Sequence, residues 1–324
     1  MRAVVLESYG DVEVLQIKAV PDPLPGPEEV VVEIVATALN RADLLQRRGF
    51  YPGPPMPHEI PGMEFSGRVV AHGPRVSPER LGDEVMGIVG GGAYAERIAV
   101  HERQLLAVPP SVALADAAAI PEVFITAYDA LVVQGGLTSG RVALVHAGGS
   151  GVGTAAIQIA KAIGARVIVT ASAGKVDRCL ELGADRAVDY ASEDFVTAVA
   201  EVCPAGVDTV LDVIGGDYVD RNVSALRVGG RIVQVGVMGG GTTSVNIGAL
   251  LPKRASLVGT VLRARPLEEK IALTRRFADE MLPRFADVLA PVIDSRYPLD
   301  AIAEAHRHME ANANVGKIVI DVAS

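Results

Sequence analysis

The sequence of 324 residues has only two cysteines, Cys179 and Cys203. Two cysteines far apart in the chain cannot build a disulfide framework, and they lack the short spacing of redox and zinc motifs. Both fall in segments that the sequence pattern predicts to be helical. We therefore expect two reduced thiols, in the core or near the surface of a cytoplasmic protein.

Long apolar runs and runs of one charge are missing as well. No apolar stretch is long enough to span a bilayer, and the first residues do not resemble a signal peptide. The net charge is −9 and no basic run occurs, which argues against a surface dedicated to nucleic acid. A chain of 324 residues suits about two domains, and with 49% apolar and 21% charged residues we expect an ordinary soluble globular protein.

The most informative segment that is present runs from Arg141 to Ile159 and reads RVALVHAGGSGVGTAAIQI. It predicts a buried strand, a glycine-rich turn and a helix of small residues. The first N–H groups of such a helix have no partner within it, and together with the helix dipole they can bind a phosphate or pyrophosphate. The candidate cofactor-binding residues of this turn are Gly148, Ser150, Gly151, Val152 and Gly153.

This turn departs from the dinucleotide fingerprint G-x-G-x-x-G, which would place glycines at 148, 150 and 153. Position 150 is a serine here. A glycine string alone is a weak signal, so a tight strand–helix turn without a ligand stays open as an alternative.

The next strand, expected over Ala165–Ala171, bears on the choice of cofactor. In NAD-binding domains an acidic residue about 20 positions after the glycines accepts the ribose hydroxyls. Here the corresponding tip carries no carboxylate and instead has Ser172 and Lys175. An acid would repel a 2′-phosphate, whereas an ammonium and hydroxyls would hold one, so the sequence favours NADPH. Alternatively, Lys175 is a solvated residue of the next helix.

Further strand–helix units follow and predict a parallel sheet covered by helices on both faces, a doubly wound α/β fold. Two glycine runs, Gly215–Gly216 and Gly236–Gly241, fall at carboxyl ends of strands, where ligands bind in such sheets. Gly236 and Val237 are therefore further cofactor candidates, although both runs could be flexible loops. The expected strands are Arg186–Tyr190, Val207–Ile214, Arg231–Val237 and Ser256–Leu262, and the expected helices Lys175–Leu182, Glu193–Cys203 and Tyr218–Leu226.

The flanking parts of the chain read differently. Residues 1 to about 120 alternate over short segments punctuated by proline and glycine, which predicts a compact antiparallel β unit. After about residue 265 we expect a helix (266–285), a strand (290–297), a helix (299–311) and a last strand (316–322) that returns to the N-terminal unit. Residues 1–120 and 265–324 would then form a catalytic domain around a dinucleotide-binding domain of residues 121–264, with the active site in the cleft between them. The short N-terminal strands are expected at 2–7, 12–20, 29–38, 64–72, 83–88 and 94–100.

Several segments resemble the zinc-free quinone oxidoreductases of the medium-chain dehydrogenase/reductase superfamily, and the likeness extends from end to end. They are ALNRADLLQRRG (38–49), PGMEFSG (61–67), GDEV (82–85), AAAIPE (117–122), HAGGSGVGTAAIQ (146–158), VMGGG (237–241) and MEANANVGKIV (309–319). The resemblance implies a GroES-like β-rich catalytic domain, a Rossmann domain, NADPH as hydride donor and quinones as acceptors.

The resemblance also implies that the enzyme uses no metal. Zinc-dependent relatives carry a Cys where this chain has Asn40, and a His where it has Met63, just before the retained Glu64. They also have a lobe with four cysteines. Because zinc needs converging Cys, His or carboxylate ligands, these replacements predict a zinc-free site.

Site residues follow from the same resemblance. Tyr51 would face the substrate and Asn40 the nicotinamide, so these two are the catalytic candidates, while Asn40 also counts as cofactor-binding. Thr126 would touch the nicotinamide side, Ser150 Oγ could bond a phosphate, and Lys175 and Tyr190 would hold the 2′-phosphate. Plainer interpretations are that Tyr51 caps a surface loop and that Asn40 satisfies local backbone. For the histidines we expect His146 to be packed or beside the cofactor, and His306 and His308 to lie on a solvated helix face.

Three functions remain open. The first is NADPH:quinone reduction, and the second is NADPH-dependent reduction of activated alkenes such as enones or enoyl thioesters. The third is a non-catalytic, NADPH-bound protein with a structural or RNA-binding role, which the acidic net charge disfavours.

The apolar strand Ser256–Leu262, expected at a sheet edge, predicts a homodimer, with a higher oligomer as the alternative.

Overall fold

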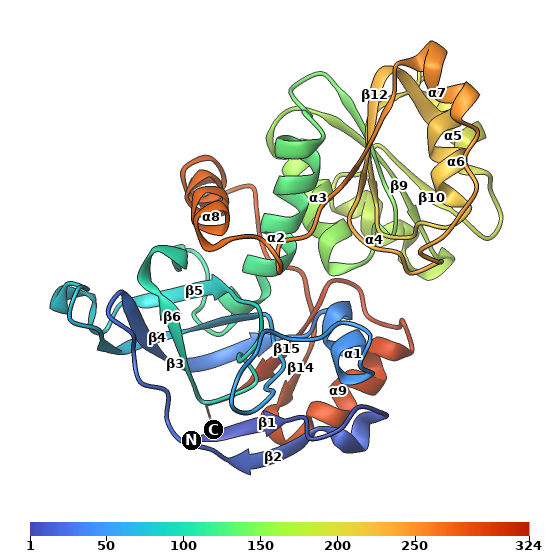
Figure 1. Ribbon diagram of the computed structural model, residues 1–324. Coiled ribbons are helices and arrows are strands. Elements are labelled where there is room, and N and C mark those ends of the chain that lie inside the picture. The colour runs from blue at the N-terminus through green and yellow to red at the C-terminus, as the bar shows by residue number, and fades with distance from the viewer. Residues whose placement is uncertain (324) are drawn as a thin grey trace. The chain divides into compact units, whose positions relative to one another are not determined.

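The computed structural model describes residues 1–323 and contains two compact units, drawn in Figure 1. Unit 1 comprises Met1–Val123 together with the described residues from Arg263 onward, and unit 2 comprises Phe124–Leu262. The chain therefore leaves unit 1, builds unit 2 and returns. Each unit has its own sheet and its own hydrophobic core.

Unit 2 is built on a parallel sheet of six strands in the order β10-β9-β8-β11-β12-β13. In chain order this is 3-2-1-4-5-6, the Rossmann arrangement, in which the strand order reverses beside the first strand. Central strands are continuous apolar runs, because both faces of a parallel sheet are covered. The predicted doubly wound fold is confirmed. The strands are β8 (Val142–Val145), β9 (Arg166–Ala171), β10 (Arg186–Asp189), β11 (Val207–Asp212), β12 (Leu226–Gln234) and β13 (Ser256–Gly259).

Helices lie on both sides of this sheet (Figure 1). Small buried residues such as Ala155, Ala156 and Ala160 let α3 approach strands β8 and β9 closely. On another part of the sheet, Phe195, Val199 and Val223 complete the core. The helices are α2 (Pro121–Tyr128), which crosses the boundary between the units, α3 (Gly151–Ala162), α4 (Val176–Glu181), α5 (Phe195–Val202), α6 (Tyr218–Ala225) and α7 (Ile247–Lys253).

Unit 1 contains a mainly antiparallel sheet in the order β14-β15-β3-β4-β5-β7, with β6 also paired to β3, and a two-stranded sheet of β1 and β2. The last strand of the chain, β15, pairs with β3, so the predicted return to the N-terminal part is confirmed. The strands are β1 (Arg2–Val5), β2 (Gln16–Ala19), β3 (Glu29–Ala38), β4 (Glu64–His72), β5 (Glu84–Ile88), β6 (Arg97–His101), β7 (Leu105–Ala107), β14 (Ile293–Pro298) and β15 (Lys317–Asp321).

Three helices complete unit 1: α1 (Arg41–Arg47), α8 (Leu267–Met281) and α9 (Ile302–Glu310). The sequence pattern did not indicate α1, whose seven residues are too few for a clear periodicity, and it did not indicate β7. The segment expected as one strand over 12–20 is a short 3-10 helix (Val12–Val14) followed by β2, because Leu15 breaks the alternation and turns into the core.

One expectation for α9 is wrong. His306 is completely buried, not solvated, because it shares the helix face of Ile302, Ala305 and Met309 that packs into the core. Burial lowers the pKa of His306 to about 3, so the ring is neutral at physiological pH. His308, by contrast, is half-buried, and its Nδ1 lies 3.1 Å from the hydroxyl of Tyr297.

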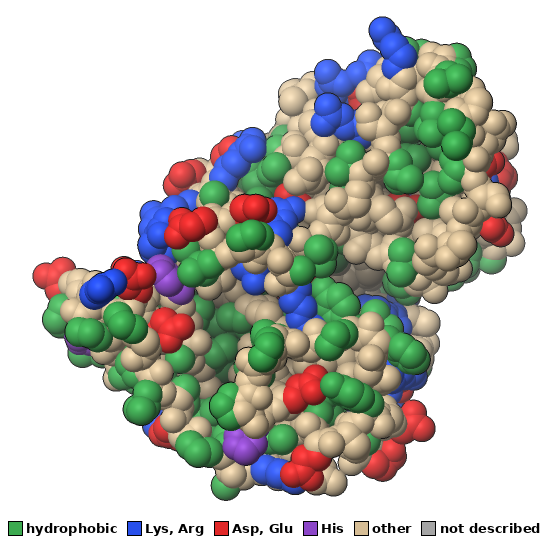
Figure 2. Space-filling model, in the orientation of Figure 1, with side chains coloured by type: hydrophobic (Ala, Val, Ile, Leu, Met, Phe, Trp, Pro, Cys, Tyr) green, Lys and Arg blue, Asp and Glu red, His purple; other side chains and the backbone are tan. Residues whose placement is uncertain are grey.

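Charged side chains of both signs lie on the surface. On the face drawn in Figure 2, Lys and Arg side chains are interspersed with Asp and Glu. No helix among residues 1–323 has the length and apolar character to cross a membrane.

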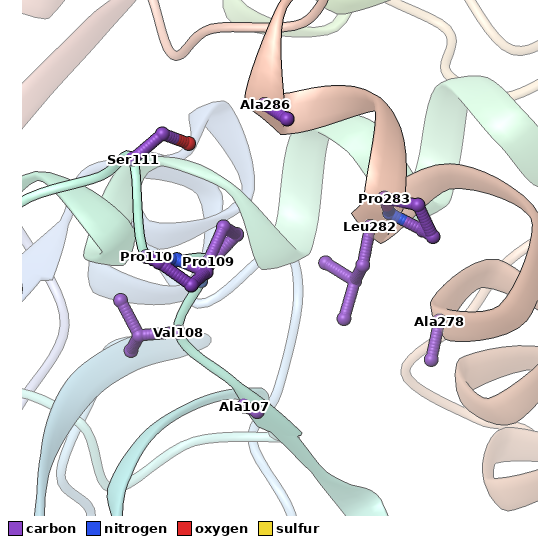
Figure 3. A pocket seen from close by; sticks show the side chains of 9 residues that line it. All are labelled: Ala107, Val108, Pro109, Pro110, Ser111, Ala278, Leu282, Pro283 and Ala286. Atoms are coloured by element: carbon purple, nitrogen blue, oxygen red, sulfur yellow. The ribbon is translucent and has the colours of Figure 1, made fainter.

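In unit 1, the segment after β7 and the end of α8 with the turn that follows it flank an open apolar groove (Figure 3). Its lining includes Val108, Pro109, Leu282 and Pro283, with Ser111 at one side.

Candidate functional site

Strand pairing in unit 1 brings three distant segments to one place. Residue Val319 of β15 lies opposite Ala38 at the end of β3, and Phe65 of β4 lies opposite Thr37. The end of β3 is therefore flanked by the beginnings of β15 and β4. These positions place Lys317 and Glu64 beside Asn40, which directly precedes α1.

The ammonium of Lys317 is buried at this junction and bonded to three oxygens. Its Nζ lies 2.6 Å from Glu64 Oε1, 2.7 Å from Asn40 Oδ1 and 2.5 Å from the carbonyl oxygen of Leu39. The side chain of Lys317 is 3% exposed and that of Glu64 is 0% exposed. An ammonium has three N–H donors, so each of them has an acceptor here.

Asn40 is fixed at both ends of its amide. Its Oδ1 accepts from Lys317, and its Nδ2 donates to Glu64 Oε1 at 2.9 Å and to the Ala38 carbonyl at 3.3 Å. Its backbone N–H donates to Asp43 Oδ2 at 2.8 Å, a contact that begins α1. The prediction that Asn40 only satisfies local backbone is too narrow, because its side chain joins three separate segments of unit 1.

Two further carboxyl groups of this cluster have raised pKa values. Burial, and then the charge of Glu64, raises the pKa of Glu122 to about 8, against the opposing effect of Lys317. Burial raises the pKa of Asp43 to about 6, opposed by its hydrogen bond from the Asn40 N–H and by Lys317. One buried ammonium cannot compensate three carboxylates, so Glu122 keeps its proton at neutral pH. Its backbone N–H donates to Glu64 Oε2 at 2.8 Å.

Tyr51 is held by Arg263, a residue that sequence reasoning missed. The Arg263 guanidinium carbon lies 4.7 Å from the centre of the Tyr51 ring, and Nη1 donates to the Tyr51 carbonyl at 3.1 Å. Its other nitrogens donate to Gln46 Oε1 at 2.7 Å and to the Gly90 carbonyl at 2.6 Å. Burial raises the pKa of the half-buried Tyr51, so its hydroxyl keeps the proton that a donor needs.

The residues at this junction do not fit a zinc site. Asn40 and Met63 cannot replace thiolate and imidazole ligands, and the Lys317 ammonium lies against the Glu64 carboxylate. Across residues 1–323, no three His, Cys, Asp or Glu side chains are grouped so that they could hold a metal ion.

In unit 2, the glycine turn lies between β8 and α3, as predicted. A Cβ at Gly153 would come within 2.3 Å of the Ala147 carbonyl oxygen, and one at Gly148 within 2.8 Å of Val169 Cβ. The glycines are therefore required by the close packing of helix against strand. Ser150 caps α3, with its Oγ accepting from the Gly153 N–H at 3.0 Å. Its hydroxyl hydrogen is not used by that contact and can be donated to a ligand.

The residues predicted to hold a 2′-phosphate lie close to this turn. Lys175 follows β9, and its stem covers Gly149, where a Cβ would meet Lys175 Cδ at 2.7 Å. Tyr190 follows β10, is 53% exposed, and its N–H bonds to Ala171 at the end of β9. Ser172 directly follows the same strand. These three segments meet at the carboxyl edge of the sheet, while their binding to a phosphate stays a prediction.

The other predicted cofactor residues also belong to this edge or to α2. Gly236 and Val237 follow β12, and the Val237 side chain is exposed. Thr126, on α2, has a buried hydroxyl oxygen without a hydrogen-bond partner among the described residues. A buried hydroxyl without a hydrogen-bond partner lowers the stability of the fold unless a ligand or a water molecule supplies that partner. Thr126 therefore fits the predicted cofactor contact.

His146 is buried at the end of β8, and the prediction of a packed residue is confirmed. Its Nε2 lies 2.7 Å from Asn222 Oδ1, while the Asn222 amide nitrogen donates to Asp212 at 2.9 Å. Nε2 is therefore the protonated nitrogen, and Nδ1 accepts from Thr170 Oγ1 at 3.0 Å. Asp212 in turn accepts from the N–H groups of Ile214 and Gly215. This chain of bonds holds the loop after β11.

Comparisons with known proteins agree with both units. The family model described as alcohol dehydrogenase GroES-like domain matches residues 26–110. The model described as zinc-binding dehydrogenase matches residues 151–278, a range that does not include the Asn40, Met63 and Glu64 positions.

Relatives match almost the whole chain. A synaptic vesicle membrane protein VAT-1 homolog from Rattus norvegicus is 32% identical over 99% of this chain and 84% of its own length. A quinone oxidoreductase from Homo sapiens is 29% identical over 99% of this chain and 97% of its own. Polyketide synthase GfsB of Streptomyces halstedii is 36% identical over 91% of this chain, which corresponds to 5% of that much longer protein.

Solved structures with the same fold include enzymes of two kinds. The quinone oxidoreductase of Pseudomonas syringae pv. Tomato DC3000 superposes with a TM-score of 0.87 at 28% identity, over 99% of both chains. The JamJ enoyl reductase gives 0.88 at 26% identity, also over 99% of both chains. A mycobacterial protein solved in complex with NADPH gives 0.86 at 28% identity, over 99% of this chain and 100% of its own.

The raised pKa of Glu122 predicts a specific dependence of stability on pH. Because the folded state keeps this proton up to about pH 8 and the unfolded state loses it near 4.5, stability should fall as pH rises between these values. Glu122→Gln removes this titration. We expect the variant to equal the wild type in urea unfolding at pH 4 and to exceed it by at least about 1 kcal/mol at pH 9.

The exposed Glu304→Gln on α9 is the matched control and should change nothing at either pH. A Glu122→Gln variant that is less stable than the wild type at pH 9 would contradict the assignment of a proton to this side chain.

Proposed function

The chain belongs to the medium-chain dehydrogenase/reductase superfamily of oxidoreductases, and we propose that it transfers hydride from NADPH to a quinone without a metal. The observation that carries this proposal is the junction of Asn40, Glu64 and Lys317, in which a tethered ammonium is bonded to the amide and the carboxylate. A quinone accepts hydride readily through its own electronics. It therefore needs orientation and hydrogen bonds more than a Lewis acid.

The cofactor edge of unit 2 supports NADPH. When bound, NADPH supplies the hydride. The first N–H groups of α3 and the Ser150 hydroxyl would hold the pyrophosphate, and the Thr126 hydroxyl would gain the partner that it lacks. Lys175 and Tyr190 would hold the 2′-phosphate, since no carboxylate follows β9 at the position where NAD-binding domains have one.

Tyr51 and Arg263 would act on the acceptor in unit 1. The neutral Tyr51 phenol can donate a hydrogen bond to a quinone oxygen while negative charge develops there. Arg263 fixes both the ring and the backbone of Tyr51, so the loop of residues 48–57 presents the phenol in a defined position. The free thiols of Cys179 and Cys203 accord with a reducing compartment, and we propose the cytoplasm.

A second candidate is the reduction of activated alkenes. It is favoured by the enoyl reductase among the similar structures and by the matching segment of a polyketide synthase. The same hydride donor and the same hydrogen bond to a carbonyl oxygen would serve an enone or an enoyl thioester.

Steady-state turnover tests both candidates. We expect NADPH oxidation to proceed with a larger kcat/KM for simple ortho- or para-quinones than for an enone or an enoyl thioester of similar size. A reversed order would replace the first candidate by the second. Turnover with none of these acceptors would refute both.

The assignment of the 2′-phosphate site predicts the behaviour of Lys175→Ala. Loss of one charge-assisted hydrogen bond should weaken NADPH binding by ~1–3 kcal/mol and leave NADH binding nearly unchanged. Cofactor titrations followed by fluorescence measure both. Lys161→Ala on α3, whose ammonium pairs with Asp185, is the control and should alter neither affinity. Equal losses for both cofactors with Lys175→Ala would contradict the assignment.

The assignment of Tyr51 as a donor predicts the behaviour of Tyr51→Phe, which removes the hydroxyl and keeps the ring above Arg263. If the hydrogen bond contributes ~1.4 kcal/mol to the transition state, kcat/KM should fall by ~10-fold, with little change in NADPH affinity. A fully active Tyr51→Phe variant, together with an impaired Tyr51→Ala variant, would show that Tyr51 acts only through the packing of its ring and not through its hydroxyl.

The edge of the unit 2 sheet supports a homodimer. Strand β13 is the edge strand of the unit 2 sheet, and its Leu257 is exposed. Ile247 and Leu251 of α7 are exposed as well. An open apolar edge strand favours pairing with a second copy. We expect a dimer in sedimentation velocity at micromolar concentration, and a monomer for Leu257→Lys. Val228→Lys, at an exposed position of β12, should leave the dimer intact. A wild-type monomer would refute this arrangement.

A further inference from the structure

We propose that Lys317 is a positioning residue of the active site, whose ammonium sets the orientation of the Asn40 amide and holds Glu64 against it. This inference rests on the proposed function, because it concerns how the same site is kept ready for hydride transfer. Nothing in the local sequence marks Lys317 for this role, since it opens an apolar strand near the end of the chain.

Each N–H donor of the Lys317 ammonium has an acceptor. Its three acceptors are a carboxylate oxygen, an amide oxygen and a backbone carbonyl oxygen, all within 2.7 Å. They come from β4 and from the residues between β3 and α1, and the lysine itself comes from β15. The ammonium therefore ties together three segments that the chain connects only through long detours.

The two ends of the Asn40 amide face groups of opposite charge. An ammonium only donates hydrogen bonds, so the oxygen of the amide must face Lys317. The amide nitrogen is then directed to Glu64 Oε1, at 2.9 Å. The reversed amide would place its NH2 group against the ammonium and its oxygen against the Glu64 carboxylate. Lys317 and Glu64 therefore both favour the same one of two amide orientations that are nearly equal in shape.

Burying an ion pair costs free energy, because both charges lose their water. A pair such as Lys317 and Glu64 can often be replaced by neutral groups of similar shape without loss of stability, whereas the loss of one partner is strongly destabilising. Stability alone therefore does not require this pair. What neutral groups would lose is the directed contact to Asn40, together with the charge on Glu64, whose Oε2 accepts from the Glu122 N–H.

Substitutions of Lys317 and Glu64 separate an effect on stability from an effect on positioning. The variants are Lys317→Met, Glu64→Gln and the double variant Lys317→Met/Glu64→Gln. Lys18→Met, which removes a lysine paired with Glu7 at the surface, is the matched control. Urea unfolding, NADPH affinity, kcat and KM are measured for each, with the acceptor that the wild type reduces best.

We expect Lys317→Met to be clearly less stable than the wild type and the double variant to regain most of that loss. In the double variant kcat should stay at least 10-fold below the wild-type value, with NADPH affinity within 3-fold of it. The control should match the wild type in all measurements. A double variant that regains wild-type kcat together with stability would overturn the inference. So would a double variant that does not fold, because removing both charges removes the cost of burying either one alone.

A second cycle tests whether Lys317 acts through Asn40. If it does, Lys317→Met/Asn40→Ala should have a kcat no lower than that of the weaker single variant, because both changes remove one interaction. Losses that multiply would contradict this route. If the proposed function is wrong, the wild type itself will not reduce quinones. The cycles do not depend on that result, because each variant is compared with the wild type on the acceptor that the wild type reduces best.

Discussion

The pairing of β15 with β3 is the contact on which the candidate active site depends. It is antiparallel and places Val319 opposite Ala38, so the beginning of the last strand meets the end of β3. Because β4 flanks β3 on its other side, Lys317 and Glu64 arrive on either side of Asn40. A shift of β15 by one residue would direct the lysine to the opposite face of the sheet, since side chains alternate along a strand.

The charges at this junction follow from burial. One ammonium faces Glu64 directly, while Asp43 and Glu122 lie near the same groups, and the interior cannot hold three uncompensated carboxylates. Glu64 makes the closest contact with the ammonium, and Glu122 keeps a proton instead. The result is a site in which a fixed cation, an oriented amide and a neutral carboxyl group lie together.

The two units use different means to prepare a site. In unit 2, the site is prepared mainly by backbone geometry, because glycines permit close packing at the turn. Hydrogen bonds of the buried Asp212 and His146 hold the neighbouring loops. In unit 1, the site is prepared by side chains from distant parts of the chain: Arg263 holds Tyr51, and Lys317 holds Asn40.

Local patterns in the sequence determined the Rossmann unit, because its strands are continuous apolar runs and its turn is marked by glycines at fixed spacing. They also placed Gly148–Gly153, Ser172, Lys175 and Tyr190 at one edge, since parallel strands share that edge. Only the tertiary structure decided the burial of His306, the contact of Arg263 with Tyr51 and the bond of Lys317 to Asn40. The physical reason is that these contacts join residues far apart in the chain, and strand register and helix packing, which bring them together, have no local signature.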